Sequence, residues 1–138
     1  MRLTSHRSKL PALLVALLIG WPAWGQVGDT SPAAQLERWR SQAGVPAQAE
    51  RGRVFFQSRH GGEWSCASCH GSPPTQAGEH ASTGKAIAPM APAFNSKAFT
   101  DTAKVDKWFR RNCKDVLSRE CSPAEKADVL AYLISLKP

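Results

Sequence analysis

Cys66-Ala67-Ser68-Cys69-His70 is the stretch that decides how this chain folds. The spacing C-x-x-C-H is typical of an attachment site for a c-type haem. Two intervening residues let both thiols reach the vinyl groups of one porphyrin, and the histidine that follows is then held beneath the iron as its proximal ligand. A redox disulfide or half of a zinc site would need only C-x-x-C, and no second C-x-x-C follows at zinc spacing. We therefore expect one covalently bound haem c on Cys66 and Cys69, with His70 as an iron ligand.

The beginning of the chain has the pattern of a secretory signal. Residues 1–9 are basic, residues 10–19 are apolar apart from one proline, and residues 23–25 have small side chains at their two outer positions. The apolar run is short for a membrane span. We predict a cleaved signal peptide over 1–25 and a cytochrome c domain over 26–138, with no stable membrane insertion. An uncleaved N-terminal anchor is the alternative. Export predicts a periplasmic location, where disulfides persist.

The charge balance argues against a nucleic-acid partner. Cleavage removes three of the eighteen Lys and Arg residues and no acidic residue, which leaves fifteen basic and eleven acidic side chains. This excess is too small to indicate binding to nucleic acid. The remaining length suits one domain rather than two.

Caps and turn residues divide the rest of the chain into helices. Ser31-Pro32 predicts a helix start and Gly44 predicts its end. A second helix is expected from near Pro46 toward the haem motif, followed by a loop over 57–65. Residues 71–99 hold four of the ten prolines and predict a long irregular loop, which a haem edge would organise.

Two further helices are expected at the end of the chain. Thr100 or Asp101 can cap the first, whose apolar stripe is formed by Val105, Trp108 and Phe109. The last begins with the capping box Ser122-Pro123-Ala124-Glu125. Its apolar face is expected to contain Val129, Leu130, Tyr132, Leu133, Ile134 and Leu136. No stretch alternates with a period of two, so we expect no sheet and an all-α fold around the haem.

Gly52 predicts a close crossing of two helices. A glycine inside a helix lowers its stability by up to about 1 kcal/mol, so close packing would give a reason for its presence. In this respect the chain is similar to single-domain cytochromes c, in which a glycine and an aromatic residue of the first helix meet the last helix. Gly52 and Phe55 or Phe56 would meet Tyr132 and Leu133.

The ligand on the other side of the iron determines function. A strong ligand gives an electron carrier, and a weak one gives an exchangeable binding site. Met90, twenty residues after His70, is one candidate, but we assign it to apolar packing. His80 is assigned to a solvated loop, and His60 to solvent or a haem propionate. Asn112 is the fourth candidate.

Two cysteines remain after haem attachment. Cys113 and Cys121 are expected to pair in an oxidising compartment and to stabilise the fold by about 2–3 kcal/mol. The bridge would fix the backbone beside Asn112, at what we expect to be the end of the helix that carries Trp108. Two free buried thiols are the alternative.

A specific pattern runs along nearly all of the expected domain. Its most specific part combines Trp108, Asn112, Cys113 and Cys121. Its other parts are residues 28–32, 49–53, the haem motif, 87–89 with 91–92, 99–101, 107–108, 111–113, 119–121 and 125–128. With these residues, the chain resembles the SHP-type (sphaeroides haem protein) high-spin cytochromes c.

The resemblance implies a class I-like cytochrome c fold with the Asn112 amide as a weak distal ligand, beside a Cys113–Cys121 disulfide. The amide would leave when the iron is reduced, so that ferrous haem can bind O2 or NO. An amide oxygen suits soft ferrous iron less well than ferric iron, which agrees with this role. The resemblance also implies electron exchange with a dihaem cytochrome c and a membrane cytochrome b.

The sequence therefore favours a periplasmic high-spin cytochrome c that transfers single electrons and reversibly binds a diatomic ligand. One alternative is a low-spin electron shuttle with His70 and Met90 as axial ligands. Another is a terminal reductase for oxygen or nitrogen-oxide species, although we find no obvious general acid for O–O cleavage. The basic side chains from Lys104 to Arg119 predict either a docking face for an acidic redox partner or a solvated helix face.

Overall fold

The computed structural model describes residues 28–138, so the expected signal peptide lies outside the described residues. The first helix, α1 (Pro32–Ala43), begins and ends at the predicted residues. The Ser31 hydroxyl accepts a hydrogen bond from the backbone N–H of Ala34, at 3.1 Å. Gly44 adopts a left-handed conformation with φ of 66°, which ends the helix at the residue that tolerates it.

The haem motif itself forms a short helix. Helix α2 (Ala49–Gln57) leads toward it, and α3 (Cys66–His70) contains the whole motif. The second helix starts at Ala49 rather than near Pro46, because Gln48 is still extended and donates its backbone N–H to Asp128 Oδ1, at 2.7 Å. The haem motif was expected to lie between loops, and its helical conformation was not predicted.

The prediction that the chain has no sheet is wrong in one small region. Strands β1 (Gly78–Glu79) and β2 (Ala86–Ile87) pair antiparallel, with Gly78 opposite Ile87. Two-residue strands are too short for an alternating pattern to appear in the sequence, which is why period-two analysis missed them. Apart from this hairpin, residues 71–99 contain no helix or strand, as expected.

The last two helices begin at the predicted caps. Helix α4 (Thr102–Leu117) has Asp101 as its N-cap, and α5 (Pro123–Ser135) opens with the reciprocal hydrogen bonds of Ser122 and Glu125. Trp108 departs from the expected apolar stripe. Val105 and Phe109 are buried, but 49% of Trp108 is exposed, because it lies on the flank of α4 rather than on its buried face. No helix within residues 28–138 is long and apolar enough to cross a bilayer.

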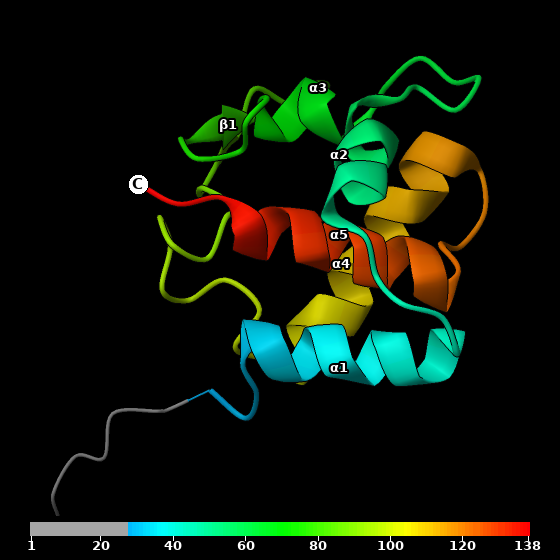
Figure 1. The fold of residues 1–138 in the computed structure, drawn as a ribbon. Coiled ribbons are helices and arrows are strands. Elements are labelled where there is room, and N and C mark those ends of the chain that lie inside the picture. Colours follow the sequence, from blue (N-terminus) through cyan, green and yellow to red (C-terminus); the bar gives the residue numbers. More distant parts are fainter. Residues whose placement is uncertain (1–27) are drawn as a thin grey trace, which may run out of the picture.

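Helix α5 lies at the centre of the molecule (Figure 1). Helices α1 and α2 pack closely along it, whereas α4 keeps a greater backbone distance from its neighbours. Helix α3 and the hairpin lie together at one end, with α1 at the opposite end. The buried apolar core consists of Trp39, Phe56, Val105, Phe109, Cys113, Cys121, Ala127, Val129, Leu130, Tyr132 and Leu133.

Side chains of α1 and the residues before it hold α4 in place. Arg38 pairs with Asp106 through both guanidinium Nη atoms, and this hydrogen bonding lowers the pKa of the Asp106 carboxyl. Asp29 Oδ1 accepts a hydrogen bond from the backbone N–H of Thr102 at 2.8 Å. Gly28 packs so closely against Thr100 that a Cβ there would lie 1.9 Å from the Thr100 carbonyl oxygen.

The predicted close crossing occurs between α2 and α5. A Cβ on Gly52 would lie 1.9 Å from the carbonyl oxygen of Asp128. The rings of Phe56 and Tyr132 lie 5.7 Å apart beside this contact, and both side chains are buried. Phe56, rather than Phe55, is the fully buried aromatic residue of α2. Glycine at position 52 therefore lets the two backbones touch.

Gly52→Ala should destabilise the haem-loaded protein by about 3 kcal/mol, since the added methyl group forces two backbones apart. Gly44→Ala is the matched control. No atom lies within 4 Å of a Cβ at Gly44, so only its left-handed conformation resists the change, at about 1 kcal/mol. Denaturant unfolding followed by circular dichroism measures both. An equal loss in the two variants would show that the crossing tolerates a side chain.

Candidate haem site

Helix α3 presents the predicted attachment residues from a fixed turn. Ser65 and Ser68 exchange side-chain to backbone hydrogen bonds of 3.2 and 3.0 Å, which pin the start of the helix. Cys66 and Cys69 are the cysteines of the described chain that form no disulfide. Burial raises the pKa of the Cys66 thiol to about 11, so the thiol is neutral in the protein. Neither sulfur is bound in a disulfide, so both are available for thioether bonds.

His70 has the properties required of an iron ligand. Burial lowers the pKa of its imidazole, which favours the neutral form that binds metals. Its Nδ1 atom is buried and has no hydrogen-bond partner among the described residues. The Phe56 ring lies 6.3 Å from the imidazole, so α2 contributes to the position of the ligand. A neutral imidazole beside two unpaired cysteines fits a covalently attached haem.

The hairpin packs against the end of the haem motif. A Cβ on Gly78 would lie 2.0 Å from the Cys69 carbonyl oxygen, and the backbone N–H of Ala81 lies 3.3 Å from Cys69 Sγ. The sequence did not predict this contact of Gly78, because a glycine in an irregular loop is not unusual. An open hollow of about 350 Å³, lined by residues 70–73 and 75–77, lies next to His70.

Met90 packs against the apolar core, which is the role that the sequence assigned to it. The backbone N–H groups of Met90 and Ala91 both donate to the Pro74 carbonyl oxygen, at 3.1 Å. These bonds tie the loop before α4 to the loop after α3. That Met90 does not bind the iron stays a prediction.

The two loop histidines are exposed, as expected for His80 and for the solvent alternative at His60. His60 Nε2 lies 2.8 Å from the Phe55 carbonyl oxygen. His80 Nδ1 lies 3.2 Å from the Ser82 hydroxyl. Each imidazole thus has a polar partner within its own part of the chain.

Asn112 lies inside α4, so the prediction that it ends this helix is wrong. The helix continues to Leu117, and its caps are Asp101 and Ser118. Capping therefore does not explain Asn112. Its side chain is partly buried, and the amide forms no hydrogen bond with any of the residues from 28 to 138. The buried face of α4 is formed by residues such as Val105 and Phe109. Asn112 lies at the edge of this buried face.

The disulfide between Cys113 and Cys121 is present, which confirms the predicted pairing. The two Cα atoms lie 5.5 Å apart, and both residues are buried. The bridge joins α4, one residue after Asn112, to the residue before the N-cap of α5. It therefore fixes the backbone next to the proposed distal ligand.

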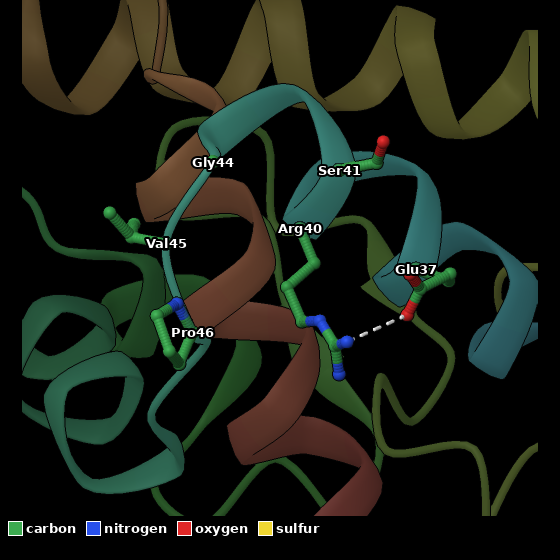
Figure 2. A pocket seen from close by; sticks show the side chains of 6 residues that line it. All are labelled: Glu37, Arg40, Ser41, Gly44, Val45 and Pro46. Atoms are coloured by element: carbon green, nitrogen blue, oxygen red, sulfur yellow. Dashed lines mark ion pairs between the residues drawn. The ribbon is translucent and has the colours of Figure 1, made fainter.

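A second surface hollow lies away from these residues, at the turn between α1 and α2 (Figure 2). It is lined by Glu37, Arg40, Ser41, Gly44, Val45 and Pro46. Glu37 and Arg40 form an ion pair of 3.5 Å across it. None of the predicted site residues lines this hollow, so we do not connect it with the haem.

Comparison with known proteins gives a consistent result. Residues 42–133 match a family model described as a domain of unknown function, DUF1924. The cytochrome c-type protein SHP of Cereibacter sphaeroides is 46% identical over 125 residues, which cover 88% of this chain and 95% of that protein. Cytochrome c'' of Methylophilus methylotrophus is 44% identical over 88 residues, covering 61% of each protein.

The fold is shared with experimental structures of both relatives. The structure of oxidised SHP, described as an oxygen-binding cytochrome c, matches with a TM-score of 0.74 and 49% identity, over 79% of this chain and all of that one. The crystal structure of oxidised cytochrome c'' from Methylophilus methylotrophus matches with a TM-score of 0.67 and 34% identity, over 78% of this chain and 95% of that one.

Met90→Leu should leave the ferric absorption spectrum unchanged, because we assign Met90 to packing and leucine keeps its size and apolar character. Unfolding free energy should fall by less than about 1.5 kcal/mol. Absorption and electron paramagnetic resonance spectra of the ferric protein measure the spin state. A change from low spin to high spin on this substitution would establish Met90 as the axial ligand.

Proposed function

The chain belongs to the SHP-type family of monohaem cytochromes c, with covalently bound haem c, and from this premise we propose that it transfers single electrons and reversibly binds a diatomic ligand. The proposed site is the sixth coordination position of the iron, which the Asn112 amide would occupy in the ferric protein. One relative is described as an oxygen-binding cytochrome c, which supports O2 as a ligand, and NO belongs to the same chemical class. We also propose that the protein works in the periplasm, after removal of residues 1–25.

The free amide of Asn112 carries this proposal. Asparagine is a poor residue for a helix interior, and the Asn112 side chain is partly buried without being held by another described residue. Its position within α4 gives it no capping role. Coordination of ferric iron would supply the partner that the described chain does not. Because an amide oxygen binds soft ferrous iron poorly, reduction would release it and open the position to an external ligand.

The other residues of the site would hold the haem and orient its proximal ligand. Cys66 and Cys69 would anchor the porphyrin through thioether bonds, and His70 would bind the iron as a neutral imidazole. When bound, the haem supplies an iron that changes oxidation state by one electron and accepts a ligand in its sixth position. Phe56 limits the movement of the His70 ring from one side.

The disulfide would keep the displacement of Asn112 local. Cys113 is bonded to Cys121, so the backbone that carries Asn112 is held while its side chain rotates away. A ligand that leaves by side-chain rotation can return without refolding of the helix. Reversible binding requires such a return.

The proposed electron partners are a dihaem cytochrome c and a membrane cytochrome b, on the basis of the family resemblance alone. A low-spin shuttle with Met90 as ligand remains the competing function, and the ferric spectrum separates the two. A terminal reductase would differ by steady turnover of its substrate with a reductant, which the proposed ligand-binding role does not include.

Asn112→Ala should give ferric protein with five-coordinate or water-bound iron, with haem attachment intact. Azide should bind faster, because no internal ligand has to leave first. If Asn112 blocks about 90% of the sites, removing it raises the apparent azide affinity about tenfold. Stopped-flow mixing with azide and the ferric spectrum measure both effects.

Asn95→Ala is the matched control for this experiment. Asn95 is also partly buried, but its amide donates to the Pro89 carbonyl at 2.8 Å and accepts from the Lys97 N–H at 3.1 Å. Its loss should lower stability by about 1 kcal/mol and leave azide binding unchanged. If Asn112→Ala behaves like Asn95→Ala, with lower stability and an unaltered spectrum, Asn112 is structural and the proposed function fails.

A further inference from the structure

Four positive side chains form a stripe along one face of α4. Lys107, Arg110, Arg111 and Lys114 are spaced by three, one and three residues, which places them on the same side of an α-helix. All four are exposed, and none forms an ion pair within residues 28–138. This basic stripe points away from the buried face of α4, which contains Val105, Phe109, Cys113 and Val116.

Most other arginines of the described chain are neutralised by a carboxylate. The pairs are Arg38–Asp106, Arg40–Glu37, Arg51–Asp128, Arg53–Glu50 and Arg119–Glu125. Lys104, at the start of α4, pairs with Asp101 in the same way. Two carboxylates of α4 lie near the basic stripe. Asp106 is already bound by Arg38, and exposed Asp115 is a single charge against four.

The basic stripe is a concentrated part of the positive charge of the domain. Residues 28–138 hold fifteen Lys and Arg side chains and eleven Asp and Glu side chains, an excess of four. The stripe holds four of the nine Lys and Arg side chains that form no ion pair within this range, gathered on one helix face. It runs for about 10 Å along the helix. Four cations could neutralise at most four phosphates, fewer than the roughly 6–10 contacts of a strongly salt-dependent DNA-binding protein.

The basic stripe borders the flank of α4 that carries Asn112. Trp108 lies four residues before Asn112, on the same flank. The Lys107 ammonium lies 5.1 Å from the centre of the Trp108 ring, and the Arg111 guanidinium lies 5.5 Å from it. Two of the four cations are therefore drawn toward the Asn112 side of the helix.

We propose that the basic stripe of α4 is the docking surface for an acidic electron-transfer protein, which is oxidised by one electron as it reduces the ferric cytochrome. This inference rests on the proposed function, since ligation by Asn112 would place the iron beside α4. No atom or proton is exchanged. A carboxylate-rich surface would be attracted at long range and oriented by the stripe, so association should be fast at low salt and slow as salt screens the charges.

The test compares two triple variants with the same net charge. Lys107→Gln, Arg111→Gln and Lys114→Gln remove three charges from the basic stripe. Lys85→Gln, Lys97→Gln and Lys137→Gln remove three exposed charges elsewhere. The probe is a plant-type [2Fe–2S] ferredoxin, an acidic one-electron donor, mixed with the haem-loaded ferric protein in a stopped-flow instrument over a range of salt concentrations. Spectra after dithionite reduction check that the haem is unaltered.

The stripe variant should lose at least tenfold in the second-order rate constant at low salt, and most of its salt dependence. The control variant should stay within about twofold of the unmodified protein. Equal losses in both variants, or no loss in either, would overturn the proposal.

A polyanion partner is tested separately. The unmodified protein and both variants are tested for binding to duplex DNA and to phosphatidylglycerol vesicles at about 150 mM salt. The acidic protein partner would also be rejected if only the stripe variant loses this binding while its reaction rate with ferredoxin is unchanged. The ferredoxin kinetics do not depend on azide binding. Failure of the docking surface is thus distinguishable from failure of Asn112 as the iron ligand.

Discussion

The backbone contact between Gly52 and Asp128 is the constraint on which the haem-binding end of the molecule depends. It lets α2 and α5 touch, and the carboxylate of Asp128 then accepts hydrogen bonds from the Gln48 N–H and from Arg51, at 2.7 and 2.8 Å. A buried carboxylate is stable only with such partners. With α2 fixed, Phe56 lies between Tyr132 of α5 and the His70 ring. The crossing of α2 and α5 thus positions the imidazole that we propose as the proximal ligand, through the ring of Phe56.

The helix that carries Asn112 is held by a different kind of interaction. Helix α4 does not approach α5 as closely as α1 and α2 do, and it is tied mainly through side chains. Arg38 of α1 forms an ion pair with Asp106. Trp39 of α1 packs edge to face against Phe109, with ring centroids 6.3 Å apart. The disulfide ties the other end of the helix. The two residues proposed as axial ligands, His70 and Asn112, are therefore supported by different interactions, so a change at one need not disturb the other.

Sequence reasoning worked where a local signal carries the information. Caps such as Ser31, Asp101 and Ser122 act within four residues, and the sequence located all three helix starts. The pairing of Cys113 with Cys121 was predicted because these two cysteines remain after haem attachment and because disulfides persist in an exported protein. The sequence placed the end of α4 too early and missed the β1–β2 hairpin. The hairpin depends on a contact with another part of the chain, that of Gly78 with Cys69. Helix α4 ends where Ser118 adopts a left-handed conformation, with no glycine in the sequence to mark the position. The flank position of Trp108 was missed because a helical repeat does not show where the buried face of a helix ends.

The contact of Gly28 and Asp29 with the first turn of α4 determines the direction in which a preceding polypeptide leaves the domain. Gly28 lies against the Thr100 carbonyl, and Asp29 accepts the Thr102 N–H. Whatever is fused ahead of residue 28, whether a purification tag or an immobilising linker, must therefore emerge beside the N-terminal end of α4. A protein attached to an electrode through its N-terminus would turn that end of α4 toward the solid surface. Attachment through Pro138, which follows the C-terminal end of α5, would hold the molecule at a different point and turn another part of it toward the surface.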